Sequence, residues 1–145
     1  MPRIKIEFQK GGTFTAKLFE DQAPKTCAAV LKRLPFECKF WQSICSGHAV
    51  VTVLSDLTAP PENQRTVGIY PGTLCFLPQD PPKNVPDEIY ITYGPYFVSR
   101  CSYIDFQQPV NVFGQIEGDA DELMKVGQRI LMEGAEMVRF TQLEP

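Results

Sequence analysis

Residues 4–9, Ile-Lys-Ile-Glu-Phe-Gln, alternate apolar and polar side chains, and residues 13–18, Thr-Phe-Thr-Ala-Lys-Leu, repeat the pattern after Gly11-Gly12. This period of two is typical of strands that bury one face. The glycines reach the positive φ angles of a tight turn without steric cost, so the pattern predicts a hairpin. Asp21-Gln-Ala-Pro-Lys-Thr then predicts a helix, with Asp21 or a near neighbour as its cap and Pro24 in its first turn.

The remaining chain predicts mostly strands and one further helix. Strands are expected over residues 48–54, 66–70, 73–77, 88–93, 110–116 and 134–143, the last with Ala135, Met137 and Val138 packing inward. In the strand at 88–93, Ile89, Ile91 and Tyr93 share one face and Tyr90 and Thr92 the other. Residues 94–108 have no clean period and are interpreted as a loop. Asp119, followed three residues later by Glu122, predicts a capped second helix.

The pattern predicts seven or eight strands and two helices, and two helices are too few for a parallel α/β sheet. A closed antiparallel barrel removes the sheet edges that so many apolar strands would otherwise expose. The sequence therefore predicts a mainly β fold, a barrel whose ends are closed by two amphipathic helices. With 145 residues and no break in composition, residues 1–145 are expected to form a single domain.

Composition excludes several classes of function. The formal charge of −3, from 14 basic and 17 acidic residues, is not the basic surface that nucleic-acid binding requires. No apolar run is long enough for a membrane span and no leader pattern opens the chain, so a cytoplasmic location is expected. Five cysteines without a C-x-x-C pair, and a single histidine, argue against disulfides and zinc. No phosphate-binding loop is present, and no metal or cofactor is expected.

Three strings, in this order, resemble the cyclophilin family: Asp21-Gln-Ala-Pro-Lys-Thr, then Pro71-Gly-Thr-Leu-Cys-Phe-Leu with Asp87-Glu-Ile-Tyr-Ile-Thr, then Val112-Phe-Gly-Gln-Ile-Glu-Gly-Asp. Together they span most of the chain. The sequence is still more similar to compact bacterial and archaeal cyclophilin-like proteins of unknown function, whose Pro-Phe-Glu matches Pro35-Phe36-Glu37. The resemblance implies an eight-stranded closed antiparallel barrel capped by two helices.

The catalytic pattern that this resemblance implies is changed here. Cyclophilins carry Phe-His-Arg after the first helix, and the Arg stabilises the twisted prolyl amide; this chain has Phe40-Trp41-Gln42 with no Arg following. An amide side chain of the family is replaced by a carboxylate in Asp87-Glu88-Ile89-Tyr90. Loss of such a donor removes an electrostatic contribution of about 3 kcal/mol to the transition state. The sequence therefore predicts that prolyl isomerase activity is absent.

His48 is the one side chain whose ordinary pKa suits proton transfer near neutral pH, and it is a candidate catalytic residue together with Arg65. The alternative for His48 is a histidine satisfied by backbone groups at a barrel mouth, which is the commoner case for a lone histidine. Arg65 and Arg100 could bind a carboxylate bidentately, although most arginines simply lie on the surface.

Aromatic side chains with polar tips grip and orient small ligands, and Trp41, Tyr70, Tyr90, Tyr93, Tyr96 and Phe97 form such a set. Trp41, Tyr70 and Tyr93 are the preferred ligand-binding candidates, together with Arg100, Glu88 and Asn111. Their alternative is core packing and the anchoring of loops. Asn111 and Gln115 point either inward or outward, and the period leaves both open. Cys75 lies in an apolar strand and is expected to be a buried thiol.

Three functions are compatible with these features. The first is binding of a small polar or anionic metabolite beside the barrel, with or without hydrolysis or isomerisation of a small cyclic amide or acid. The second is a prolyl isomerase whose catalytic arginine is displaced to Arg65 or Arg100. The third is a non-catalytic module in which exposed aromatics between Gly94 and Phe106 build a homo-oligomer.

Overall fold

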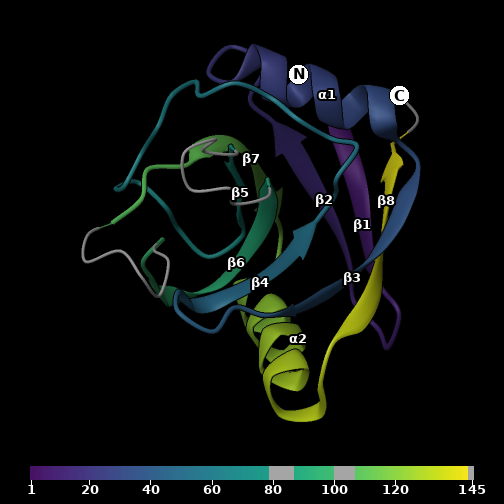
Figure 1. The fold of residues 1–145 in the computed structure, drawn as a ribbon. Helices are drawn as coiled ribbons and strands as arrows, with labels where there is room; N and C mark the ends of the chain where they lie inside the picture. The colour runs from purple at the N-terminus through teal and green to yellow at the C-terminus, as the bar shows by residue number, and fades with distance from the viewer. Residues whose placement is uncertain (79–86, 100–106, 144–145) are drawn as a thin grey trace.

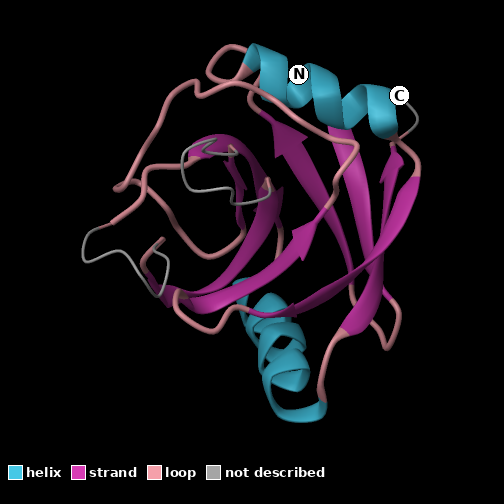
Figure 2. Cartoon of the chain, in the orientation of Figure 1, coloured by secondary structure: helices cyan, strands magenta, loops and turns pink. Residues whose placement is uncertain are grey.

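The computed structural model describes residues 1–78, 87–99 and 107–143, and its strands form a closed barrel (Figures 1 and 2). The elements are β1 (Arg3–Phe8), β2 (Thr13–Leu18), α1 (Pro24–Arg33), β3 (Phe36–Gln42), β4 (Gly47–Val53), β5 (Thr73–Leu77), β6 (Glu88–Phe97), β7 (Asn111–Glu117), α2 (Ala120–Glu133) and β8 (Glu136–Gln142). All neighbours pair antiparallel in the order β1-β2-β7-β5-β6-β4-β3-β8. The predicted eight-stranded antiparallel barrel with two helices is confirmed.

The barrel interior is built by the alternation of the strands. In β1 and β2 the residues Ile4, Ile6, Phe14 and Leu18 are buried, and the register pairs Ile6 with Phe14 as the predicted hairpin requires. The apolar faces of the helices complete this core with Cys27 and Val30 of α1 and with Leu123, Val126 and Ile130 of α2. Figure 1 shows that α1 lies across one end of the barrel and α2 across the other.

The strand predicted over 66–70 is wrong. This segment is a loop, and the residue just before it, Arg65, forms an isolated bridge to Val110. The physical reason is that β5 already pairs with β6 on one edge and with β7 on the other, which leaves no edge for another strand. Conversely, part of the loop expected at 94–108 belongs to β6, which continues to Phe97.

The inward face of the last strand also differs from the prediction. Val138 is buried as predicted, but Ala135 is exposed and Met137 points outward, and the other inward positions are Glu136 and Phe140. A glutamate stands at an inward position because Arg129 of α2 forms an ion pair with it at 2.5 Å. Charged residues are rarely buried without such a partner. The apolar pattern alone therefore placed Ala135 and Met137 on the inward face instead of Glu136.

The cap of α1 comes from a distant loop rather than from Asp21. The N-cap residue is Ala23, which makes no side-chain cap bond. Instead, the carboxylate of Glu62 accepts the backbone N–H groups of Lys25 at 3.0 Å and Thr26 at 2.7 Å, and also the Thr26 hydroxyl at 2.6 Å. These bonds satisfy donors that a helix leaves open at its start. α2, in contrast, is capped as predicted, by Oδ1 of Asp119.

We expect Glu62→Gln to make the stability of the protein less dependent on acidic pH. Partial burial raises the pKa of Glu62, but the hydrogen bonds from Thr26 and Lys25 outweigh burial and hold this pKa below the ordinary 4.5. The stabilisation is therefore complete above pH 4.5 and is lost as the pH falls through the lower pKa of the folded protein. The cap contributes about 1 kcal/mol.

Thermal unfolding of Glu62→Gln between pH 7 and pH 3 checks this prediction. The exposed Glu20, changed to Gln, is the matched control and should behave as the wild type. An unchanged pH profile in Glu62→Gln would mean that this carboxylate does not cap α1 in solution.

Candidate functional site

One row of residues crosses the outer surface of five neighbouring strands. The register pairs Trp41 with Val51, Val51 with Tyr90, Tyr90 with Cys75, and Cys75 with Val112. Trp41 at the β3 end is 39% exposed, whereas the other four residues are buried. We call this set the outer row; it crosses β3, β4, β6, β5 and β7 in that order, with one residue from each strand.

The outer row is unusual because the outside of a barrel normally meets water. Here it belongs to a second apolar cluster, separate from the interior core, that also contains Ala49, Leu77 and Val110. Phe19, Ile69 and Phe97 pack against this cluster. Strands buried on both faces read as continuous apolar runs, as in β4 and β5. Because four of its five residues are buried, the outer row is a covered second core, and Trp41 is its exposed end.

A carboxyl group lies on the same face, two residues before Tyr90. The Tyr90 hydroxyl donates to Oε2 of Glu88 at 3.3 Å. Burial raises the pKa of Glu88, and the Tyr90 hydrogen bond lowers it by less, so the net pKa is above the ordinary value. Among the described residues, Tyr90 is the hydrogen-bond partner of this carboxyl group. Such a group can accept a hydrogen bond from a ligand or exchange a proton closer to neutral pH.

A hollow of about 430 Å³ lies at the end of this face, within the range of small-molecule sites. Its lining residues are neutral: Cys45, Ser46, Gly47, Pro95, Tyr96, Phe97 and Val98. Ser46 is 3% exposed, and its hydroxyl has no hydrogen-bond partner among the described residues. The Phe97 ring meets the Tyr90 ring edge-on at 5.9 Å, so the hollow adjoins the outer row.

A wide bulge in β6 forms one wall of the hollow. Ala49 pairs with Thr92 and Gly47 pairs with Phe97, so His48 alone lies opposite the four residues 93–96. The His48 ring contacts the rings of both Tyr93 and Tyr96. Its Nδ1 accepts the backbone N–H of Tyr96 at 3.3 Å.

The structure divides the predicted site residues into separate groups. Trp41 and Glu88 lie on the outer face. Arg65 lies beside β7, where its backbone bonds to Val110 and its guanidinium donates to Gln22. Tyr70 is 66% exposed in the loop before β5, and its carbonyl accepts the Thr92 hydroxyl.

The other predicted residues lie elsewhere. His48 and Tyr93 meet beneath the β6 bulge, and the Tyr93 hydroxyl donates to Oε1 of Gln42 at 2.6 Å. The Asn111 side chain forms hydrogen bonds with Thr26 of α1 and with Pro60, Glu62 and Gln64 of the loop between β4 and β5. Arg100 lies outside the described residues. No hydrogen bond or hollow in the described part of the chain joins His48 to Arg65.

Burial raises the pKa of the Cys75 thiol, in keeping with its place in the outer row, and it is not a thiolate at neutral pH. Within residues 1–78, 87–99 and 107–143, no cluster of three His, Cys, Asp or Glu side chains could hold a metal ion. Neither described helix combines the length and hydropathy needed to span a bilayer.

Some site residues were not anticipated. Ser46, Gly47 and Pro95 line the hollow, yet no function was predicted for any of them from the sequence. The signal for the outer row was present in the continuous apolar run of 49–53, because such a strand must be covered on both faces.

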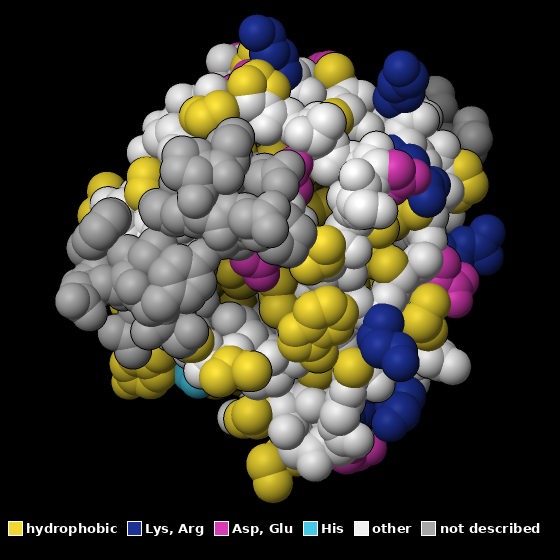
Figure 3. Space-filling model, in the orientation of Figure 1, with side chains coloured by type: hydrophobic (Ala, Val, Ile, Leu, Met, Phe, Trp, Pro, Cys, Tyr) yellow, Lys and Arg dark blue, Asp and Glu magenta, His cyan; other side chains and the backbone are white. Residues whose placement is uncertain are grey.

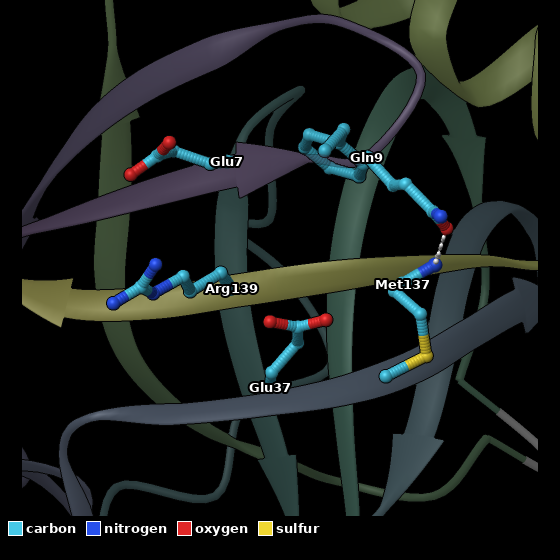
Figure 4. Close-up of a pocket in the computed structure, with 6 residues that line it drawn as sticks. Glu7, Gln9, Glu37, Met137 and Arg139 are labelled. Carbon is cyan, nitrogen blue, oxygen red and sulfur yellow. Dashed lines mark hydrogen bonds between the residues drawn. The ribbon is translucent and has the colours of Figure 1, made fainter.

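A second hollow, of about 250 Å³, lies on the other side of the barrel over β1, β8 and β3 (Figure 4). Arg139 pairs in register with Glu7 on one side and with Glu37 on the other. Figure 4 shows the charged ends of Glu7 and Arg139 projecting in the same direction. Arg139 and Glu37 are exposed, and the lining has no buried polar side chain without a partner. This charged surface is the weaker candidate for a ligand site.

Figure 3 shows hydrophobic side chains gathered in the lower centre of one face of the molecule. Trp41, Ile44, Tyr96 and Val98 are the exposed large apolar residues of β3, β6 and the segments that follow them, with Ile44 94% and Tyr96 75% exposed. They come from the same elements as the outer row and the hollow.

Known structures resemble this fold closely, at low sequence identity. McbB in complex with tryptophan has a TM-score of 0.72 and 21% identity over 98% of this chain, and this chain spans 45% of McbB. A hypothetical protein, AF2241 from Archaeoglobus fulgidus, has a TM-score of 0.64 and 18% identity, with 98% of this chain and 95% of that chain covered. The Mimivirus cyclophilin has a TM-score of 0.62 and 19% identity, with 97% and 87% covered.

These structures establish a cyclophilin-like fold. No curated protein sequence matches the chain. A family model described as "Protein of unknown function (DUF3830)" matches residues 6–142, nearly the whole sequence. The chain therefore belongs to the DUF3830 family and has the cyclophilin-like barrel.

Proposed function

We propose that this chain binds a small metabolite on the outer face of its barrel. The observation that carries the proposal is the neutral hollow of about 430 Å³, which adjoins the outer row through Phe97 and is lined by Ser46, a residue whose buried hydroxyl has no hydrogen-bond partner among the described residues. Small-molecule sites typically combine an apolar lining with a few polar groups of this kind.

The chemistry of the site favours a ligand with an apolar or aromatic body and polar ends. The hollow offers aromatic walls and no charge among its described residues, which suits the uncharged body. Glu88 would accept a hydrogen bond from an amine or amide of the ligand, and Arg65, beside β7, would attract an anionic group. McbB, which has a similar fold, was solved with tryptophan, a molecule of this class.

We further propose that the chain is not a prolyl isomerase. Trp41 is the β3 residue of the outer row, and β3 contains no arginine to stabilise a twisted amide. We expect no acceleration of cis–trans exchange in a proline-peptide assay. Acceleration that disappears in Arg65→Ala would instead support a displaced catalytic arginine. If the protein converts a small cyclic amide or acid, loss of that activity in both His48 and Arg65 variants would support these two residues as a catalytic pair.

Replacing Glu88 with Gln is expected to weaken ligand binding about tenfold, because a hydrogen bond to a charged group contributes about 1.5 kcal/mol or more. The measurement is a thermal-shift screen with L-tryptophan, other amino acids, aromatic amines and small carboxylates, followed by calorimetry on the hits. Glu37→Gln, an exposed carboxylate of the charged hollow, is the matched control. The proposal fails if no compound binds, or if Glu37→Gln weakens binding as much as Glu88→Gln.

The exposed side chains of Ile44 and Tyr96 favour self-association as a second candidate function. Light scattering at high protein concentration tests it, with Ile44→Glu as the variant. A dimer that dissociates in Ile44→Glu would support a homo-oligomeric module, and a monomer at all concentrations would exclude it.

A further inference from the structure

We infer that His48 positions the wall of the hollow through Tyr96 and makes this wall sensitive to acid. The effect on ligand binding rests on the proposed function, whereas the effect on the wall does not. The ring centroid of His48 lies 5.2 Å from those of both Tyr93 and Tyr96. Nδ1 accepts the Tyr96 backbone N–H at 3.3 Å, and Tyr96 lines the hollow. One imidazole therefore connects the ring of Tyr93 with the wall of the hollow.

Two glycines allow this arrangement. A Cβ on Gly94 would overlap Nδ1 of His48, so any larger residue there would displace the imidazole. A Cβ on Gly47 would overlap the carbonyl oxygen of Tyr96. The β6 bulge can therefore approach β4 this closely only because Gly47 has no side chain. The carbonyl of Gly47 in turn accepts Nε2 of Gln42 at 2.5 Å. Gln42 also holds the Tyr93 hydroxyl, so the ring beside His48 is fixed.

Protonation changes what the imidazole can do at Nδ1. A neutral imidazole can accept a hydrogen bond at one nitrogen, but a protonated imidazole donates at both. Histidine side chains commonly change charge between pH 5 and pH 8. On protonation, an Nδ1–H would face the N–H of Tyr96, and the bond between them would be lost. The attraction of a cation to the Tyr93 ring keeps the imidazole in place, so the change falls on the backbone N–H of Tyr96, which loses its acceptor.

No opposing charge in the described structure compensates for this change. The ionisable groups that face His48 are the phenols of Tyr93 and Tyr96, and burial raises the pKa of Tyr93, which stays protonated. β3 contributes the neutral Gln42, and α2 meets Tyr93 through Gly127. The charged residues of α2 are paired elsewhere or exposed: Lys125 with Glu122, Arg129 with Glu136, Glu133 with Lys10, and Asp121 at the helix start.

The test is the hydrogen-exchange protection factor of the Tyr96 amide in the ligand-free protein between pH 8 and pH 5. We expect protection to fall about fivefold as the pH is lowered, as for the loss of one hydrogen bond. In His48→Asn the amide oxygen Oδ1 can accept the same N–H and does not titrate, so protection should be independent of pH. In His48→Leu it should be low throughout, and if this variant does not fold, His48→Asn alone decides.

A second measurement separates this inference from the proposed function. In the Glu88→Gln background, where the carboxyl group bonded to Tyr90 no longer titrates, L-tryptophan or the best compound of the screen should bind about fivefold more weakly at pH 5 than at pH 8, and equally at both pH values once His48→Asn is added. The inference would be overturned if protection of the wild-type Tyr96 amide did not change with pH. It would also be overturned if protection in His48→Asn changed with pH as it does in the wild type. A Tyr96 amide that responds to pH in a protein that binds none of the compounds would overturn the proposed function and leave the role of His48 standing.

Discussion

Replacing Arg129 with alanine is expected to lower the free energy of unfolding by about 3 kcal/mol, because it leaves a buried carboxylate without its partner. The Glu136 side chain is 1% exposed and that of Arg129 is 22% exposed. The same guanidinium donates to the carbonyl of Gly11 at 2.8 Å, so the substitution also removes one hydrogen bond between α2 and the β1–β2 turn. Chemical denaturation measures the effect.

The exposed ion pair of Arg33 with Asp56 is the matched control. Its atoms are nearly as close, at 2.7 Å, but its side chains are 39% and 58% exposed. Arg33→Ala should therefore cost less than about 1 kcal/mol. The double variant Arg129→Met with Glu136→Leu should recover most of the lost stability, because it buries no unpaired charge. Equal losses in Arg129→Ala and Arg33→Ala would show that burial of the Arg129 pair has no energetic consequence.

Gly127→Ala is expected to destabilise the protein by about 2 kcal/mol, although alanine is the better helix former. In an open helix this change would gain about 1 kcal/mol. Here the new Cβ would overlap the ring of Tyr93, which is 1% exposed and held by its hydrogen bond to Gln42. Forcing extra volume into a packed core costs about 1–3 kcal/mol or more, and this outweighs the gain in propensity.

Thermal unfolding checks the sign of the Gly127→Ala effect, with Gln128→Ala as the control on the exposed side of the same helix. We expect Gln128→Ala to change stability by less than about 0.5 kcal/mol. A stabilised Gly127→Ala would mean that the Tyr93 ring does not pack against α2 as described.

The fold was predictable because its signals are local and repeated. The alternation in residues 4–18, the Asp119 cap and the apolar runs of 49–53 and 73–77 each specify an element. No strand was predicted at β3, and the one predicted over 66–70 was wrong, but so many apolar strands are still best satisfied by closure. The errors occurred where a distant residue decided the outcome. Glu62 caps α1 from a loop, and Arg129 allows Glu136 to point inward, so neither could be derived from its own neighbourhood.

The candidate site was less predictable for the same reason. Trp41 and Glu88 were named and lie on the outer face, but the sequence did not indicate that Tyr90 would connect them to Phe97. Their association depends on strand register and on the β6 bulge, which are set by tertiary pairing. His48 was singled out for its chemistry, and its observed bond to the Tyr96 backbone agrees with the alternative of a histidine satisfied by backbone groups.

Mapping of amide chemical shifts during a titration with L-tryptophan, and then with the other compounds of the screen, tests ligand binding on the outer face most directly. We expect saturable shifts at Gly47, Tyr90 and Phe97, which connect the hollow to the outer row, and none at Glu7, Glu37 or Arg139 across the barrel. Shifts confined to the Glu7, Glu37 and Arg139 surface, or no saturable shift with any compound, would contradict it.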